Sequence, residues 1–428
     1  MITGGDIAQL QGTPVTSIAP AATMRERLLL IVLYITVLAS SVAFVEPSPH
    51  DAMMGVLAVA CLIAGVHFDR RIALLVILLL IFNVGGVLSL LNVPGQEKTV
   101  QYTATSIYLM LAAIVFACLA AERTMLRLAA LRAAYILTAV IVSIAGICGY
   151  FHAFPGAEDL FAPGGRALGF FKDPNVFGPF LIWPMLIVAE RMIVRRATLL
   201  DLAIFVILMI GLLLSFSRGA MFHFAVSAAV VIVLAFLTAP STRIRVRILG
   251  LTLIGIAALA ALFALALSFE SIAAMIKDRF HLTNSYDVGQ GGRFELQELA
   301  LSALLHYPNG MGPFEFSRVN GTQQHNVYLQ ALLVYGWIGG VSYVMMLAAT
   351  FMVALRSVFV ATPWQPYLIT ALGAFTGEVL EGFVIDTDHW RHFFLLLGII
   401  WGLWAATAKY VRQKSAPISN GRAAYVHA

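Results

Sequence analysis

Residues 199–238 read LLDLAIFVILMIGLLLSFSRGAMFHFAVSAAVVIVLAFLT, a pattern typical of a membrane protein. Two apolar runs, 199–215 and 219–238, flank the turn Ser215-Phe216-Ser217-Arg218-Gly219. Each run is close to the roughly 20 residues that a helix needs to cross a bilayer. The stretch therefore predicts two membrane helices joined by a tight polar turn at one membrane face.

The rest of the chain has the same character. Of its 428 residues, 60% are hydrophobic and only 11% are charged, whereas soluble globular proteins carry about 25% charged residues. So little charge cannot cover a surface that faces water, and the composition also excludes a disordered chain, a coiled coil and a disulfide scaffold. The three cysteines lie in apolar segments without a CxxC pair, so they indicate no structural zinc site.

Twelve apolar runs predict transmembrane helices, so we expect an all-α polytopic membrane protein embedded in a lipid bilayer. The runs are 27–45, 52–67, 72–91, 104–121, 129–150, 175–193, 199–215, 219–238, 246–268, 337–356, 364–384 and 392–409. We expect tails over 1–26 and 411–428, nine spans over 27–268, a large loop over 269–336 with short amphipathic helices, and three spans over 337–410.

The basic residues predict the sidedness of the chain. The tails and the even-numbered loops hold 18 of the 27 Lys and Arg residues, which the positive-inside rule assigns to the cytoplasm. Both termini are then cytoplasmic, and the long loops 151–174 and 269–336 face outward. Because the basic residues are scattered rather than gathered in one patch, the sequence indicates no nucleic-acid partner. The outward basic residues are Lys98, Arg166, Lys172, Arg218, Lys277, Arg279, Arg293, Arg318 and Arg391.

The glycine-rich segment 164–175 carries Arg166 and Lys172 directly before the sixth expected span. Asp173 or Asn175 is a candidate cap of that helix, and Pro174 suits its first turn. Such a helix start would offer N–H groups and a positive dipole end to a phosphate. An ordinary capped loop accounts for the same residues.

Two further arginines lie next to glycines, Arg218 in a tight turn and Arg293 at the start of an amphipathic stretch. Arg218 is placed near the membrane face, where a charge is costly and is usually functional, although an arginine that snorkels to lipid phosphate would look the same. Arg293 follows two glycines and begins an amphipathic stretch that suits a surface helix. It would equally suit an ion pair with Glu295 or Glu298.

His325 lies with Asn326 and Tyr328 where the large outward loop re-enters the membrane. A histidine can take up or release a proton near neutral pH. A lone histidine is more often structural, but the neighbouring amides and Tyr328 favour a polar site here.

The last outward loop reads Asp386-Thr387-Asp388-His389-Trp390-Arg391-His392. Asp-x-Asp-His contains side chains that a divalent ion could use, but the spacing is not diagnostic, and two carboxylates can also orient Arg391. Upstream, Glu378 and Glu381 fall in or near the eleventh span, where acidic residues are rarely without a function.

A set of short motifs follows in order along the second half of the chain. It comprises Gly169-Phe170 with Asp173-Pro174-Asn175, Ser217-Arg218-Gly219-Ala220, Arg293, His306-Tyr307-Pro308-Asn309-Gly310-Met311-Gly312-Pro313, His325-Asn326 and Gly336-Trp337-Ile338-Gly339. In this order and spacing, residues 160–345 resemble the O-antigen ligase and polymerase superfamily of bacterial envelopes.

The resemblance implies a glycosyltransferase of the bacterial inner membrane with a periplasmic site, an inverting mechanism, and no metal or other cofactor. Its donor would be a polysaccharide on undecaprenyl diphosphate, and its acceptor a sugar hydroxyl of lipid A–core. Arg218 and Arg293 would bind the diphosphate and His325 would act as general base or as a diphosphate ligand. The expected substrate-binding residues are Arg166, Lys172, Asn175, Asn326, Tyr328, Asp388, His389 and Arg391.

Three other functions stay open. An O-antigen polymerase would use the same donor with a second lipid-linked glycan as acceptor. A protein O-oligosaccharyltransferase would modify Ser or Thr. A secondary transporter would suit twelve spans with Glu378 and Glu381, but it would commonly show duplicated halves, which this sequence lacks.

Overall fold

The computed structural model describes residues 23–45, 48–93, 96–194, 197–279 and 291–415, so most of the two expected tails lies outside the described residues. Within these ranges the chain forms α-helices and short 3₁₀ turns and contains no strand, which confirms the expected all-α fold. The helices are α1 (Met24–Ala39), α2 (Pro49–Ala64), α3 (Ala73–Ser89), α4 (Glu97–Ala121), α5 (Thr124–Tyr150), α6 (Ala157–Phe161), α7 (Pro174–Phe180), α8 (Ile182–Val194), α9 (Leu199–Leu214), α10 (Arg218–Thr238), α11 (Thr242–Leu267), α12 (Glu270–Arg279), α13 (Arg293–Leu304), α14 (Glu315–Asn320), α15 (Val327–Val358), α16 (Gln365–Glu381) and α17 (Arg391–Ser415).

Each expected span falls on a helix, and the sixth is divided between α7 and α8 next to Pro179. By length and composition, eight segments of the described chain can cross a membrane. They are 70–92, 97–121, 124–150, 174–193, 218–238, 242–267, 327–358 and 391–415. Helices α2 and α9 are apolar but shorter. The protein is thus a multi-pass membrane protein, while the number of twelve spans and their sidedness stay predictions.

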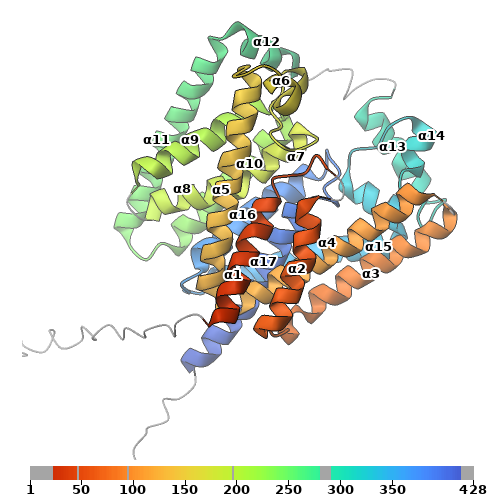
Figure 1. Cartoon of the computed structure of the whole chain (residues 1–428), viewed down its shortest axis with the longest axis horizontal. Coiled ribbons are helices and arrows are strands. Elements are labelled where there is room, and N and C mark those ends of the chain that lie inside the picture. Colours follow the sequence, from red (N-terminus) through yellow and green to blue (C-terminus); the bar gives the residue numbers. More distant parts are fainter. Residues whose placement is uncertain (1–22, 46–47, 94–95, 195–196, 280–290, 416–428) are drawn as a thin grey trace, which may run out of the picture.

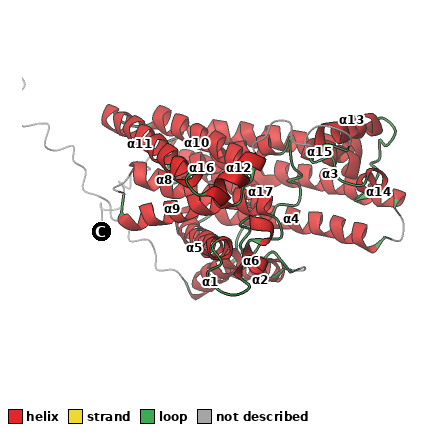
Figure 2. Cartoon of the chain, turned by 90° about the horizontal axis from the view of Figure 1, so that it is seen from above, coloured by secondary structure: helices red, strands yellow, loops and turns green. Residues whose placement is uncertain are grey.

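The helices form two lateral groups around a central pair. Figure 1 shows α8, α9, α10 and α11 on one side and α3, α13, α14 and α15 on the other, with α16 and α17 between them. Figure 2, from above, shows the same order and places α1, α2 and α5 along one flank. The start of α1 and the end of α17 lie at the same end of the molecule, away from α6 and α12 (Figure 1).

Glycines let the central helices approach their neighbours closely. Gly398 and Gly402 form a GxxxG pair on α17, and a Cβ at either position would collide with backbone of α4. Gly373 and Gly377 form a second pair on α16, against Ser227 and its neighbours on α10. Helices in lipid lack a hydrophobic force to bring them together, so small residues that allow close van der Waals contact drive their association.

Glycine also allows α3 and α15 to approach each other closely. A Cβ on Gly85 would collide with the carbonyl oxygen of Tyr335 and would lie 2.9 Å from the backbone nitrogen of Gly339. The ring of Phe82 stacks on that of Tyr335 with centroids 3.9 Å apart. These helix pairs, α4–α17, α10–α16 and α3–α15, have the most extensive contacts in the described structure.

The segment 269–336 contains α12, α13, α14 and the first residues of α15. Helix α15 thus begins before the expected span 337–356, and it bends at Gly336, whose φ of 67° and ψ of −179° break the helix. The bend is occupied by the motif 306–313, because Trp337 N donates to Pro308 O at 2.9 Å and Met311 N donates to Leu333 O at 2.6 Å. A side chain at Gly336 would clash with Pro308 and Asn309, so the two motifs fit together through glycine.

We predict that Gly398→Ala lowers the unfolding temperature in detergent, because its methyl group would meet Ala113 O and the Phe116 side chain. Overpacking of this kind costs about 1–3 kcal/mol. Gly250→Ala on α11 is the matched control, since nothing lies within 4 Å of its Cβ position. An equal effect of the two substitutions would contradict the close packing of α17 on α4.

Candidate functional site

The turn before α10 places Arg218 as the first residue of that helix. Ser217 caps α10 by accepting a hydrogen bond from Ala220 N at 3.3 Å. Phe216 has a φ of 47°, which is uncommon for a residue with a side chain. Such backbone strain clusters at functional sites, and here it lies two residues before the arginine.

Arg166 is attached to this turn. Its Nε donates to Ser215 O at 2.9 Å, and its Nη2 donates to Asn175 Oδ1 at 3.0 Å. The predicted neighbours Arg166, Asn175 and the Arg218 turn are therefore brought together. Lys172 is exposed, directly before Asp173.

The start of the sixth expected span does not offer the free N–H groups that the sequence predicted for a phosphate. Asp173 caps α7 and accepts from Asn175 N at 2.7 Å, while the N–H groups of Val176 and Phe177 donate to Asp173 O. Pro174 has no N–H group to offer. All donors of this short first turn are thus used within the protein.

His325 lies at the start of α15 opposite Asp386. Its Nδ1 is 3.6 Å from Asp386 Oδ2, and its φ is 50°. The other carboxylate oxygen, Oδ1, accepts from Asn326 N at 3.0 Å. Asp386 therefore holds the strained backbone next to His325 and faces the imidazole as well. The 3.6 Å separation exceeds a hydrogen bond, but such contacts are often long before substrate binds.

Asn326 fixes where α15 begins. Its Oδ1 accepts from Tyr328 N at 3.0 Å and Leu329 N at 3.1 Å, and its Nδ2 donates to Phe383 O at 3.2 Å. Tyr328 donates its hydroxyl to Val379 O at 2.5 Å. The predicted residues Asn326 and Tyr328 thus join α15 to the end of α16 and to residues 382–390, which we call the α16–α17 loop.

Arg293 is the first residue of α13, as expected, and Gln297 lies one helical turn later on the same face. Gln297 Nε2 reaches His325 O at 3.4 Å and Phe383 O at 3.2 Å. The face of α13 that carries Arg293 is therefore the face in contact with the His325 segment.

Asp388 is the centre of a buried hydrogen-bonded cluster. Its Oδ2 accepts from the hydroxyls of Tyr102 at 2.6 Å and Tyr335 at 3.1 Å, and His389 Nδ1 lies 3.1 Å away. The second nitrogen of His389 is 3.1 Å from Tyr102 O, and Gln330 donates to the Tyr102 hydroxyl at 3.1 Å. Asp388 and His389 thus hold the α16–α17 loop between α4 and α15.

The two carboxylates of this loop have opposite pKa shifts. Burial raises the pKa of Asp386 above its ordinary value, while the nearby imidazole of His325 acts in the opposite direction. Burial would raise the pKa of Asp388 as well, but His389 and the two tyrosine hydroxyls together lower it below 3.8. Asp388 therefore keeps its charge at neutral pH, while Asp386 accepts a proton more readily. Divergent carboxylates of this kind are typical of acid–base sites.

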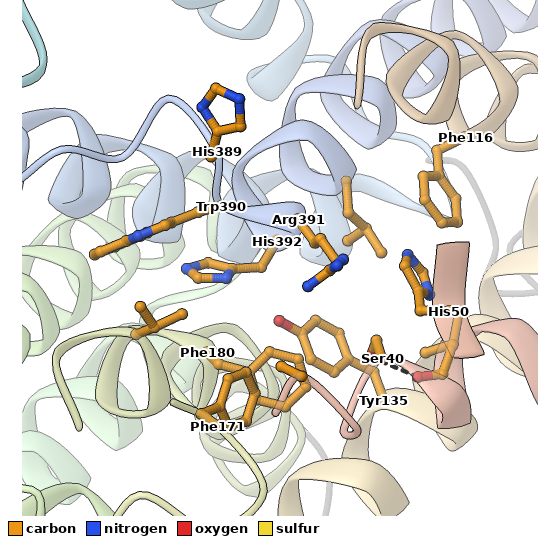
Figure 3. A pocket seen from close by; sticks show the side chains of 14 residues that line it. Ser40, His50, Phe116, Tyr135, Phe171, Phe180, His389, Trp390, Arg391 and His392 are labelled. Carbon is orange, nitrogen blue, oxygen red and sulfur yellow. Dashed lines mark hydrogen bonds between the residues drawn. The ribbon is translucent and has the colours of Figure 1, made fainter. Parts of the chain in front are cut away.

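Arg391 is bound elsewhere. Its Nε and Nη2 donate to the two oxygens of Asp51 on α2, both at 3.0 Å. With His392, His50 and Tyr135 it lines a cavity of about 60 Å³ between the start of α17 and helices α1, α2 and α5. Figure 3 shows the Arg391 guanidinium and the Tyr135 hydroxyl directed into this cavity. This places Arg391 in a separate cluster from His325.

In the described residues no three His, Cys, Asp or Glu side chains are grouped to hold a metal ion. Asp386 and Asp388 instead face different protein partners, His325 and Tyr102. Sequence reasoning weighed Asp386 as a metal ligand or as a partner that orients Arg391, and it missed the contact of Asp386 with His325. It also missed Tyr102, Tyr335 and Gln297, because no local pattern relates them to residues so far away in the chain.

The features so far define a class: a helical, multi-pass membrane protein with arginines and a histidine–carboxylate pair at helix starts. Residues 203–344 match the family model described as O-Antigen ligase. This match covers 142 of the 428 residues and confirms the resemblance to the O-antigen ligase superfamily. It implies a glycosyltransferase-like enzyme of the O-antigen ligase or polymerase kind. No curated protein matches the chain in a sequence search.

We predict that Asp388→Asn lowers thermal stability at pH 5–8, because three hydrogen bonds to a charged group are weakened, at a cost of about 1.5–3 kcal/mol. Since the pKa of Asp388 is lowered in the fold, this contribution is present above its ordinary value of 3.8. It is lost as the pH falls through the lowered pKa. The gap in unfolding temperature between wild type and variant should therefore narrow below about pH 4. A difference in unfolding temperature that does not change with pH would contradict this account. Asp159→Asn, at an exposed position on α6, is the control.

Proposed function

We propose that the protein is an O-antigen ligase. It transfers a polysaccharide from undecaprenyl diphosphate to a sugar hydroxyl of lipid A–core, on the periplasmic side of the bacterial inner membrane. The observation that carries this proposal is that the family match, 203–344, includes Arg218, Arg293 and His325 together. These are the residues that the sequence selects for the diphosphate and for the proton.

The donor would react at C1 of its terminal sugar. The acceptor oxygen attacks C1, the bond from C1 to the diphosphate oxygen breaks, and the electron pair leaves with the diphosphate. Arg218 and Arg293 would stabilise the negative charge on the leaving group, because a guanidinium donates paired hydrogen bonds and stays charged. Fixed cations can supply this stabilisation without a metal ion.

Arg166 would act on the same end of the donor. Its contact with Ser215 O supports the turn that carries Arg218, and its contact with Asn175 ties it to α7. Lys172, two residues before the start of α7, would add positive charge for the diphosphate of the donor. These assignments, and substrate contacts by Asn326, Tyr328, Asp388, His389 and Arg391, stay predictions.

His325 would take the proton of the acceptor hydroxyl as general base. Asp386 faces its Nδ1 at 3.6 Å, and in this proposal Nε2 is the nitrogen that accepts the proton of the hydroxyl. A carboxylate in this position orients the imidazole and stabilises the imidazolium that forms. A single displacement of this kind inverts the configuration at C1.

The proposal is tested by an in vitro transfer assay with purified protein, undecaprenyl-diphosphate glycan, lipid A–core and EDTA. We expect the wild type to transfer the glycan. We expect His325→Ala to lose about 10²–10⁴-fold in rate, as for loss of a general base. Arg218→Ala and Arg293→Ala should each lose about 10²–10³-fold, as for loss of an electrostatic group at the leaving oxygens.

Arg318→Ala is the matched control, because Arg318 is also an outward arginine but pairs with Glu315 at the surface. It should keep its rate within about twofold. Lengthening of the lipid-linked glycan without transfer to lipid A–core would instead identify a polymerase. Transfer that requires added metal would overturn the metal-free mechanism.

A further inference from the structure

Glu381 is a buried carboxylate at the point where α10 and α16 meet. It is the last residue of α16, and its side chain is 1% exposed. Its Oε1 faces Gly219, the residue directly after Arg218, and a Cβ on Gly219 would lie only 2.6 Å from that oxygen. The glycine therefore lets the start of α10 rest directly on the carboxyl group.

His223 holds the other oxygen of Glu381. Its Nδ1 is 2.8 Å from Glu381 Oε2, and its Nε2 is 2.8 Å from Ala374 O. A carbonyl oxygen can only accept, so Nε2 carries a hydrogen, and one more proton must lie between Nδ1 and Oε2. The pair therefore has no net charge, whichever partner holds that proton.

The neutral acid is the form that suits the surroundings of Glu381. Its Oε1 is buried and has no hydrogen-bond partner among the described residues. An unpaired buried oxygen costs more when it is charged than when it is the carbonyl oxygen of an acid. With the proton on Oε2, Glu381 donates to His223 Nδ1 and presents a neutral oxygen to Gly219.

The backbone after Glu381 supports the other half of the candidate site. Gly382 O accepts from Val327 N at 2.8 Å, at the first turn of α15. Phe383 O accepts from both Asn326 and Gln297, and Asp386 faces His325. The segment 381–383 thus contacts the start of α10 through the side chain of Glu381. Its backbone carbonyl groups contact the start of α15, next to His325, and helix α13, which carries Arg293.

We propose that Glu381, held by His223, is a positioning residue that sets the Arg218 turn relative to His325. This inference rests on the proposed function, in which Arg218 stabilises the leaving diphosphate and His325 takes the proton of the acceptor hydroxyl. A shift of about 1 Å between two such groups can cost on the order of 100-fold in rate.

The first test compares three variants in the transfer assay with the donor concentration varied. Glu381→Ala removes the support of Gly219, and kcat/KM for the donor should fall about 10–100-fold, while the KM for the acceptor is unchanged. Glu381→Gln should stay within about twofold of wild type, because an amide reproduces the donor and the neutral oxygen of the acid. Glu378→Ala is the matched control, one turn earlier on α16.

Glu378 is equally buried, and its Oε1 lies 3.3 Å from Nε2 of His392 on α17. It has no contact with Gly219 among the atoms nearest to that glycine. Both alanine variants should lose thermal stability, because both leave a cavity where a buried side chain was packed beside a histidine. Only Glu381→Ala should lose donor kcat/KM, which separates positioning from a general effect on folding.

A double-mutant cycle tests the contact itself. Gly219→Ala drives a methyl group against Glu381 and should lower donor kcat/KM about 10-fold in the wild-type background. In the Glu381→Ala background the methyl group has room, so the further loss should be less than about threefold.

The outcomes separate the two proposals. If wild type transfers the glycan but Glu381→Ala keeps full activity, or Glu381→Gln fails as badly as Glu381→Ala, the positioning inference is wrong and the proposed function stands. Independent, multiplying losses in the double mutant would also overturn it. If wild type transfers nothing to lipid A–core and does not lengthen the donor glycan, the proposed function fails, and the positioning of Arg218 for that reaction fails with it.

Discussion

Close contact of helices through glycine is the constraint on which the rest of the structure depends. Side chains in lipid gain little from leaving one apolar surface for another, so helix pairs need direct van der Waals contact. Gly398, Gly402, Gly373 and Gly377 provide that contact for α17 and α16. These two helices fix both ends of the α16–α17 loop, and that loop in turn holds His325, Asn326 and α13. The geometry of the candidate site is therefore a consequence of backbone distances within the membrane.

The fold could be predicted well from the sequence, because an apolar run of about 20 residues has few structural alternatives in a bilayer. Helix ends were predicted where a local signal exists, as at Asp173 and Arg293. The bend at Gly336 was not predicted, because it depends on residues 308–311 packing against the helix from outside. The occupied N–H groups in the short first turn of α7 were not predicted either. These groups donate to Asp173 and are not left for a phosphate.

Residue types that favour anion binding and proton transfer could also be selected from sequence, and Arg166 does contact the Arg218 turn. The partners of those residues could not be predicted from the sequence. Asp388 is bound by Tyr102, and Arg391 by Asp51, across most of the length of the chain. A single sequence carries no signal for such pairs, since each requires the helix packing to be known first. The site is accordingly a set of arginines and a histidine chosen locally, and a supporting network of tyrosines and carboxylates that only the fold specifies.

That supporting network also determines whether residues 203–344, the part that matches the family model, can be treated as a separate module. The family match begins at residue 203 and ends at 344, yet Tyr102 on α4 and Asp386 and Asp388 after α16 lie outside it on either side. Residues 203–344 transplanted into the scaffold of a relative would therefore arrive without the parts that orient their histidine. A chimera designed to transfer substrate specificity to a relative would have to include α4 and the α16–α17 loop together with residues 203–344. The segment that must be exchanged is therefore longer than the segment that the family model matches.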